Sequence, residues 1–160
     1  MAVKVEKEKW EHWLTRCKGH RITKSKRISI DLSFTQDQFE KIKQGFLPAA
    51  MEDKWVIYYS RGTLYFHRSW TGYRIYTAKI LRHKSGYAIN EFCAERNADI
   101  YSNTDDNEDV ATIIFLIAKL LGIDASGIFA SSKTGELGAL QLWSTFGRMF
   151  FQPDSQREKI

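Results

Sequence analysis

Residues 54–81, KWVIYYSRGTLYFHRSWTGYRIYTAKIL, decide the fold that this chain is expected to adopt. The stretch holds three runs rich in Tyr, Ile, Phe and Trp, the residues that pack best on the pleated surface of a sheet. The dipeptides Arg61-Gly62 and Thr71-Gly72 separate these runs and are typical of tight hairpin turns. A fourth run follows at residues 87–95. The pattern predicts an antiparallel β-meander.

The segment before the meander predicts one more strand and two helices. Residues 28–34, ISIDLSF, alternate apolar and polar side chains as a half-buried strand does. Thr35 and Gln38 have the spacing of a capping box, so a helix is expected to follow Thr35. Upstream, an apolar stripe at i, i+3, i+4 and i+7 predicts an amphipathic N-terminal helix, and it consists of Trp10, Trp13, Leu14 and Cys17.

Two more helices are expected after the meander. Residues 110–121, VATIIFLIAKLL, read as a buried helix whose positive end is complemented by the acidic run before it. Residues 134–150 carry apolar side chains every three to four positions and predict a last helix. The sequence therefore predicts a single α+β domain over residues 1–152, followed by a frayed tail at residues 153–160. Its antiparallel meander would have about five strands, with N-terminal and C-terminal helices packed mainly on one face.

The alternation of the strands predicts which side chains of the meander share a face, provided that both dipeptides are two-residue turns. One face then forms the core, and its members are Trp55, Ile57, Tyr59, Leu64, Phe66, Arg68, Trp70, Tyr73, Ile75 and Thr77. The opposite face carries Val56, Tyr58, Tyr65, His67, Ser69, Arg74, Tyr76, Ala78 and Ile80. In this register Ser69 lies opposite Arg74, and His67 lies opposite Tyr76. Arg68 is the single charge on the core face and needs a carboxylate or an incoming anion beside it.

Charge is distributed unevenly along the chain. Residues 1–27 hold nine Lys and Arg against three Glu, whereas the whole chain has a net charge of +5. Between residues 54 and 90 there are seven Lys and Arg and no acid, and residues 91–109 then contain seven acids. A basic segment with interleaved tyrosines favours an anionic ligand such as a nucleotide or a nucleic acid. The basic connector at residues 16–27 is either a solvated loop or an arm that contacts phosphate.

Several classes of protein are disfavoured by the sequence. The N-terminus lacks the apolar centre of a secretory signal, and no apolar run is long enough to cross a membrane, so no membrane partner is expected. The two cysteines, Cys17 and Cys93, lie far apart and fit a reducing cytoplasm. The four histidines have no zinc-ligand spacing, and neither a phosphate loop nor a serine-hydrolase elbow is present. No metal or cofactor is expected.

These observations predict a protein that binds an anionic, nucleotide-like small molecule or nucleic acid through the meander. The predicted ligand-binding residues are Tyr58, Tyr65, His67, Arg68, Ser69, Trp70, Arg74 and Tyr76. A bland interpretation stays open, in which both faces are core, His67 is bonded internally and Arg74 pairs with Glu91 or Glu95. The second alternative is a metal-independent enzyme acting on a phosphodiester or nucleotide, with His67 moving a proton and Glu91 or Glu95 as its partner. The third is a protein-interaction module of the inhibitor or immunity type.

Part of the meander also resembles a known segment. The string LYFHRSWTGYRIY, from Leu64 to Tyr76, together with Trp55, Tyr58 and Tyr59, is similar to a segment of small uncharacterised bacterial proteins. The resemblance covers roughly residues 48–80 and implies no activity. It indicates only that this part of the chain is a unit.

Overall fold

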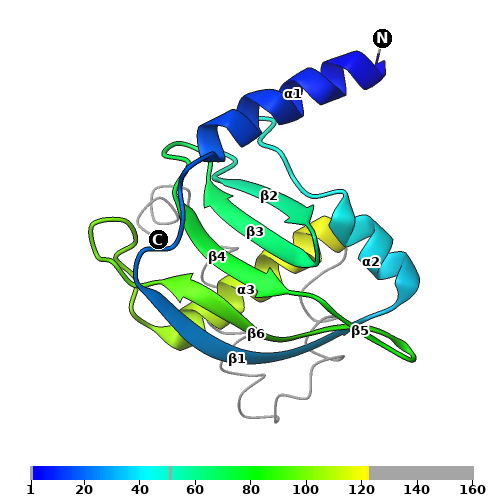
Figure 1. Ribbon diagram of the computed structural model, residues 1–160, viewed down its shortest axis with the longest axis vertical. Coiled ribbons are helices and arrows are strands. Elements are labelled where there is room, and N and C mark those ends of the chain that lie inside the picture. Colours follow the sequence, from blue (N-terminus) through cyan, green and yellow to red (C-terminus); the bar gives the residue numbers. More distant parts are fainter. Residues whose placement is uncertain (1, 51, 123–160) are drawn as a thin grey trace.

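The computed structural model describes residues 2–50 and 52–122, which fold into one antiparallel sheet with three helices (Figure 1). The elements in chain order are α1 (Ala2–Cys17), β1 (Ser25–Phe34), α2 (Gln36–Lys43), β2 (Trp55–Ser60), β3 (Thr63–Arg68), β4 (Arg74–Lys79), β5 (Leu81–His83), β6 (Gly86–Glu95) and α3 (Asp106–Leu121). The predicted α+β fold is confirmed. The helix predicted at residues 134–150 and the tail at residues 153–160 lie outside the described residues.

The sheet has six strands in the order β1-β6-β4-β3-β2, and β5 pairs with β6. The run β2-β3-β4-β6 is the predicted meander, and β1 adds to its far edge. The strand predicted over residues 73–81 is divided at Ile80 into β4 and the short β5. The predicted capping box of α2 is also present, because Thr35 accepts from the backbone N–H of Gln38 and the Gln38 side chain accepts from the N–H of Thr35.

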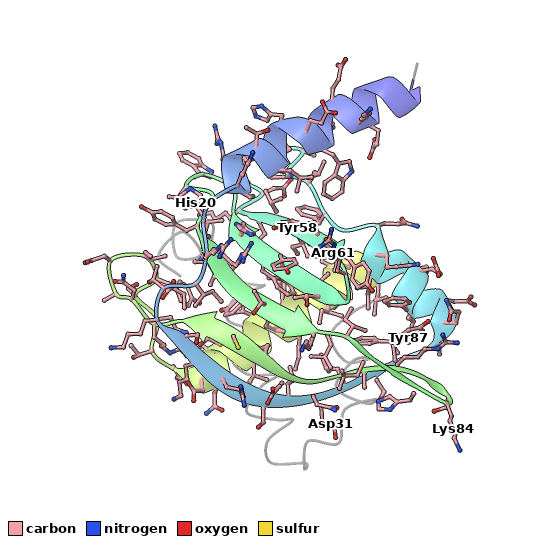
Figure 2. The ribbon with its side chains drawn as sticks, viewed as in Figure 1. His20, Asp31, Tyr58, Arg61, Lys84 and Tyr87 are labelled. Carbon is pink, nitrogen blue, oxygen red and sulfur yellow. The ribbon has the colours of Figure 1, made fainter. Side chains whose placement is uncertain are left out.

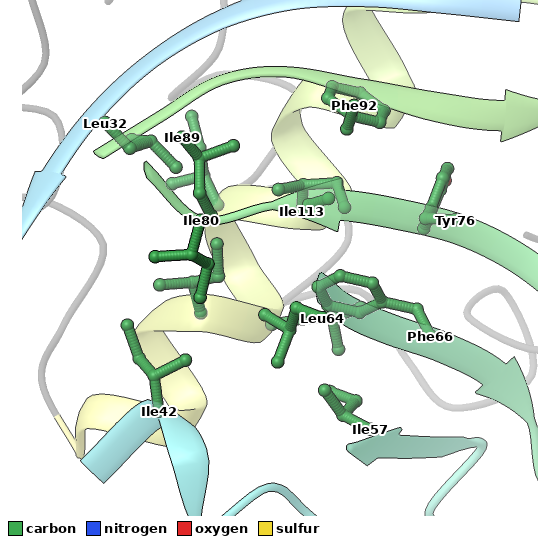
Figure 3. Close-up of a cluster of buried hydrophobic side chains, with 14 of the residues drawn as sticks. Leu32, Ile42, Ile57, Leu64, Phe66, Tyr76, Ile80, Ile89, Phe92 and Ile113 are labelled. Atoms are coloured by element: carbon green, nitrogen blue, oxygen red, sulfur yellow. The ribbon is translucent and has the colours of Figure 1, made fainter. Parts of the chain in front are cut away.

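The core lies between one face of the sheet and α3, with α2 closing one end (Figures 1 and 3). Helix α3 is apolar around most of its circumference, and nine of its sixteen residues are buried, as expected for a helix in a core. Its N-terminus is capped by the Asp105 side chain and its C-terminus ends at Gly122 in the left-handed conformation. Within the described residues no helix has the length and apolar character needed to cross a membrane.

The predicted two-residue turn between β2 and β3 is confirmed. Ser60 pairs with Thr63, so Arg61 and Gly62 alone form the loop. Their φ angles are 50° and 88°, the signs that a type I′ hairpin turn requires at both central positions. Arg61 is the only residue other than glycine with positive φ in the described chain, and a side chain there strains the backbone.

The predicted two-residue turn between β3 and β4 is wrong. The N–H of Arg68 donates to the carbonyl of Tyr73, and the loop between them is four residues long, from Ser69 to Gly72. Beyond it Phe66 pairs with Tyr76 while His67 pairs with Arg74, so β4 carries one extra residue at Ile75. This β-bulge changes which face the following side chains occupy.

Because of the bulge Tyr76 lies on the core face of the sheet, so its predicted position on the opposite face is wrong. Tyr76, Ala78 and Ile80 lie in the core beside Phe66, whereas Arg74 stays on the opposite face with His67. The Tyr76 hydroxyl donates to Asp109 Oδ1 at 2.6 Å. Burial raises the pKa of Tyr76 well above its ordinary value. This tyrosine therefore anchors α3 to the sheet and is not available on the surface.

Asp109 collects further donors around the same point. Tyr101 Oη and Asn103 Nδ2 lie 3.1 Å and 2.9 Å from its Oδ1, and the Arg96 guanidinium pairs with its other oxygen. Arg96 also pairs with Asp106 at 2.9 Å. A fully buried carboxylate is tolerated only with such compensation. The network fixes the position of α3 against β4.

Replacing Arg61 with Asn should stabilise the protein, because Asn adopts the left-handed conformation with less strain. We expect the free energy of unfolding to rise by about 0.5–1 kcal/mol in urea denaturation. Arg61→Ala is the matched control, since alanine keeps the strain and should give no gain. A gain of equal size in both variants would contradict the strained-turn explanation.

Replacing Tyr76 with Phe should lower the free energy of unfolding by about 1–3 kcal/mol, because buried Asp109 loses a donor. Tyr87→Phe is the control, since the Tyr87 hydroxyl donates to Gln36 in an exposed position and its loss should change stability by less than about 0.5 kcal/mol. Equal losses from urea titrations of the two variants would show that the Asp109 network does not hold α3.

Candidate functional site

The sheet face opposite α3 carries a cluster of four polar and aromatic side chains near the C-terminal end of α1, and Figure 2 labels one of them, Tyr58. Tyr58 of β2 lies opposite Tyr65 of β3, and His67 of β3 lies opposite Arg74 of β4. We call these four residues the Arg74 cluster. All four were predicted as ligand-binding residues, and the structure brings them together.

His67 is the buried centre of the Arg74 cluster. Its side chain is 0% exposed, and Nδ1 lies 2.8 Å from the carbonyl oxygen of Gly72. A carbonyl only accepts, so Nδ1 carries the proton and Nε2 is an acceptor. Burial lowers the pKa of His67 from 6.5 to about 4, despite the hydrogen bond to Gly72. The imidazole is therefore neutral near pH 7 with both nitrogens in use.

Arg74 is held by neutral groups. Its Nε donates to His67 Nε2 at 3.2 Å, and its guanidinium lies 4.5 Å from the ring centroid of Tyr65. One terminal nitrogen lies 3.4 Å from the Tyr58 hydroxyl. Among residues 2–50 and 52–122 no carboxylate forms an ion pair with Arg74, so the predicted alternative of pairing with Glu91 or Glu95 is not found. The guanidinium is oriented but keeps its full charge.

The two tyrosines stack on protein neighbours. Tyr58 and Tyr65 are near-parallel with centroids 4.9 Å apart, and Tyr58 also stacks on His67 at 5.5 Å. Arg74 lies over the Tyr65 ring. These contacts make the tyrosines a support for the guanidinium more than a free platform for a ligand.

The Arg74 cluster borders a groove of about 1000 Å³ beside α1. One wall is the C-terminal half of α1 and the connector after it, and the other is formed by β2 and the C-terminal end of α2. Its cationic lining residues are Lys18, Arg21, Lys43 and Arg74, its partly exposed aromatic ones are Trp10, Tyr58 and Tyr59, and Glu11 is the acid among the lining residues. The groove is therefore strongly basic.

Two glycines let α1 approach the sheet and so shape the groove. A Cβ at Gly45 would collide with the carbonyl of Ile57 and lie 2.9 Å from the ring of Trp10. A Cβ at Gly72 would collide with the carbonyl of Arg16. Both glycines have positive φ angles, 68° and 78°, and any residue with a side chain would be strained in this conformation. A residue other than glycine at position 72 would push on the backbone of α1 at Arg16, whereas at position 45 it would push on the backbone of β2 and on the Trp10 ring.

Burial also defines the chemistry of the thiol beside the Arg74 cluster. Cys17, the last residue of α1, is 3% exposed and lines the groove. Desolvation raises the pKa of its thiol to about 11, although Arg74 and Arg16 oppose this shift. The thiol is protonated near pH 7 and is not an activated nucleophile.

The remaining predicted site residues lie elsewhere. Arg68 stacks on Trp55 at 4.4 Å on the core side of the sheet, where burial lowers its pKa. Ser69 is buried and donates to the carbonyl of Asp53, and Trp70 is 64% exposed at the border of a separate hollow of about 460 Å³. Tyr76 is in the core. None of these four joins the Arg74 cluster.

The predicted acid partners of His67 serve other purposes. Glu95 is buried and accepts the backbone N–H groups of Thr23 and Lys24 at 2.7 Å and 3.0 Å. Desolvation alone would raise the pKa of Glu95, but these and neighbouring N–H donors lower it below its ordinary value. Glu91 pairs with exposed Arg27 at 3.5 Å. In the described part of the chain neither acid bonds to His67.

Sequence reasoning missed the contribution of other segments to the site. Lys43 follows from no motif and reaches the groove only because α2 ends beside β2. Lys18 and Arg21 belong to the basic connector, but nothing in the spacing of this segment predicted that it lies beside β2 and β4. The absence of acidic residues from Arg16 to Arg27 was the sequence signal for this wall of the groove.

Comparison with models of protein families, with curated proteins and with solved structures finds no match for this chain. The geometry of the groove and of the Arg74 cluster is therefore the basis on which a function is inferred.

Because burial lowers the pKa of His67, the free energy of unfolding should decrease in mild acid. Its unfolded pKa is near 6.5 and its folded pKa is about 4, so between these values the unfolded chain binds the extra proton. Stability from this group is complete above pH 6.5 and falls as the pH drops toward 4, by at most about 1.4 kcal/mol per pH unit. Urea titrations at several pH values measure this decrease in the free energy of unfolding.

His67→Gln removes this titration, so the stability gap between wild type and variant should narrow as the pH falls from 7 to 4.5. His83→Gln, at an exposed position on β5, is the matched control and should follow the wild-type profile. Parallel pH profiles for wild type and His67→Gln would contradict the low folded pKa.

Proposed function

We propose that the protein binds an anionic, nucleotide-like ligand or nucleic acid in the groove beside α1. The observation that carries the proposal is Arg74, a guanidinium oriented by neutral His67 and by the Tyr65 ring with no carboxylate pairing it in the described chain. Such a group presents its remaining N–H donors to an incoming phosphate and is already oriented before the ligand arrives.

The other lining residues support an anionic ligand. Lys18, Arg21 and Lys43 add three exposed cations to the groove, against Glu11. Of these cations Lys43 alone has an acidic partner among the described residues, Glu40, and that pair is exposed and worth little. The summed positive potential attracts polyanions and accelerates their association.

The nucleotide-like character of the ligand rests on Trp10, an aromatic ring of α1 that is partly exposed and lines the groove. A planar base can stack on this indole while its phosphate reaches Arg74, the combination that nucleotide and single-strand sites use.

Catalysis is less well supported. A general acid or base needs a free nitrogen in reach of a substrate, and His67 is buried with both nitrogens engaged. Glu91 and Glu95 are held by other partners. The enzyme interpretation therefore lacks its proton-transfer pair in the described part of the chain.

Docking of a protein partner is a second candidate, and it rests on Trp70. This indole is 64% exposed beside the hollow that Trp13 and Pro48 also line, on a different face of α1 from the groove. Large exposed aromatic side chains are enriched at protein interfaces. The groove is the better-supported site because, of its cations, Lys43 alone has an acidic partner in the described chain.

Replacing Arg74 should weaken binding of adenosine triphosphate in isothermal titration calorimetry. A lost charge-assisted hydrogen bond is worth about 1.5–3 kcal/mol, so Arg74→Ala should raise Kd at least about tenfold. Arg74→Lys should recover part of the affinity, because it restores the charge without the planar fork.

Lys84→Ala is the control for this measurement. Lys84 lies at the tip of the β5–β6 hairpin, far from Tyr58 and His20, two residues that line the groove (Figure 2), so its removal should leave Kd unchanged. Equal affinity of wild type and Arg74→Ala for adenosine triphosphate and for oligonucleotides would overturn the proposed function.

A further inference from the structure

We infer that the ligand of the groove is a single-stranded nucleic acid and not a free mononucleotide. The inference rests on the proposed function and concerns the same site. Three features carry it: the open shape of the groove, the dispersal of its cations, and the adjoining sheet face, which no element of the described chain covers.

The groove is open to solvent. Its volume of about 1000 Å³ lies at the upper end of the range for small-molecule sites, and its two walls come from α1 with its connector and from β2 with the end of α2. A site for a small molecule encloses most of its ligand surface, whereas an open channel suits a chain that enters at one end and leaves at the other.

The cations of the groove contact different neighbours and lie on different segments. Arg74 rests on Tyr65 in the middle of the sheet, whereas Lys43 lies over the ring of Phe39 at the end of α2. Lys18 and Arg21 belong to the opposite wall. Phosphates that repeat along a strand match such a dispersed set, while a single phosphate group needs cations that converge on one point.

The sheet face beyond the Arg74 cluster continues the path. Tyr65 pairs with Thr77, Thr77 with Cys93 and Cys93 with Arg27, so these four side chains form a row across β3, β4, β6 and β1. Tyr65, Thr77 and Cys93 are partly exposed and Arg27 is exposed. In Figure 1 this face of the sheet is turned away from α3. A strand bound at Arg74 can therefore extend toward β1.

Arg27 forms an exposed ion pair with Glu91 but can still contact a bound strand. Its partner Glu91 is 3.5 Å away, and both side chains are more than half exposed. An exposed pair of this kind contributes little, so a phosphate can replace the carboxylate with little loss. The row therefore ends in a cation that a strand can reach.

The test is fluorescence anisotropy with labelled oligothymidylate and oligouridylate of about twelve nucleotides, a length within the range that single-strand binding domains cover. Competitors are adenosine triphosphate and the same deoxy sequence annealed to its complement. We expect either single strand to bind at least about tenfold more tightly than adenosine triphosphate or the duplex, and affinity to fall when the oligomer is shortened to about three nucleotides.

Variants assign the binding to the groove. Lys18→Ala and Arg21→Ala alter exposed side chains and leave the core untouched, so folding is not at risk, and each should reduce the salt dependence of binding by about one phosphate contact. Arg74→Ala should weaken single-strand binding at least about tenfold. Lys84→Ala should change neither the affinity nor the salt dependence.

The outcomes separate this inference from the proposed function. Binding of adenosine triphosphate as tight as that of the oligonucleotides, with both weakened by Arg74→Ala, would overturn the inference and support the proposed function. Duplex binding as tight as single-strand binding would also overturn it. Absence of binding to every probe, or binding insensitive to Arg74, Lys18 and Arg21, would overturn both.

Discussion

One extra residue in β4 places Arg74 and Tyr76 on opposite faces of the sheet, and the rest of the molecule depends on this bulge. Without it the two residues, which are two apart in a strand, would point to the same side. With it Tyr76 reaches Asp109 and anchors α3, while Arg74 reaches His67 and faces the groove. β-Bulges often re-aim a side chain next to a functional site. The same local irregularity thus serves both stability and the candidate site.

Helix α1 forms one wall of the site, and it can lie close to the sheet because the two loops that it contacts have glycines at the contact points. Gly45 and Gly72 lie under Trp10 and Arg16 and allow the helix to approach the ends of the strands. Arg16 adds a hydrogen bond to the carbonyl of Ser69 at 3.1 Å. The groove is therefore defined by close backbone approach more than by large apolar burial, and among the described side chains of α1 Cys17 alone is buried.

The sequence predicted the parts of this fold that local chemistry determines. Alternation in β1, the capping box at Thr35 and the turn at Arg61-Gly62 are each encoded within a few residues. The turn after Arg68 was predicted wrongly because Thr71-Gly72 satisfies the hairpin signal, while the hydrogen bonds from Arg68 to Tyr73 and from Ser69 to the carbonyl of Lys54 favour a longer loop. A local sequence pattern does not predict tertiary contacts of this kind.

The same limit explains the candidate site. Tyr58, Tyr65, His67 and Arg74 were grouped correctly because all four precede or adjoin the bulge on strands whose alternation was read correctly. Tyr76 was misplaced because it follows the bulge. Lys18, Arg21 and Lys43 were not assigned because their approach depends on how α1 and α2 pack, which no spacing in the sequence expresses.

The proposed binding role depends most on the neutral histidine that holds Arg74. A buried carboxylate at position 67 would orient a guanidinium more strongly, and it would also cancel the charge. A neutral imidazole accepts from Nε without cancelling anything, and the nearby cation helps to keep that imidazole neutral. Arg74 is partly exposed and has no ionic partner in the described chain, so the arrangement adds no ion pair to the stability of the fold. An external anion could supply the missing partner, and this is the physical basis of the proposed binding role.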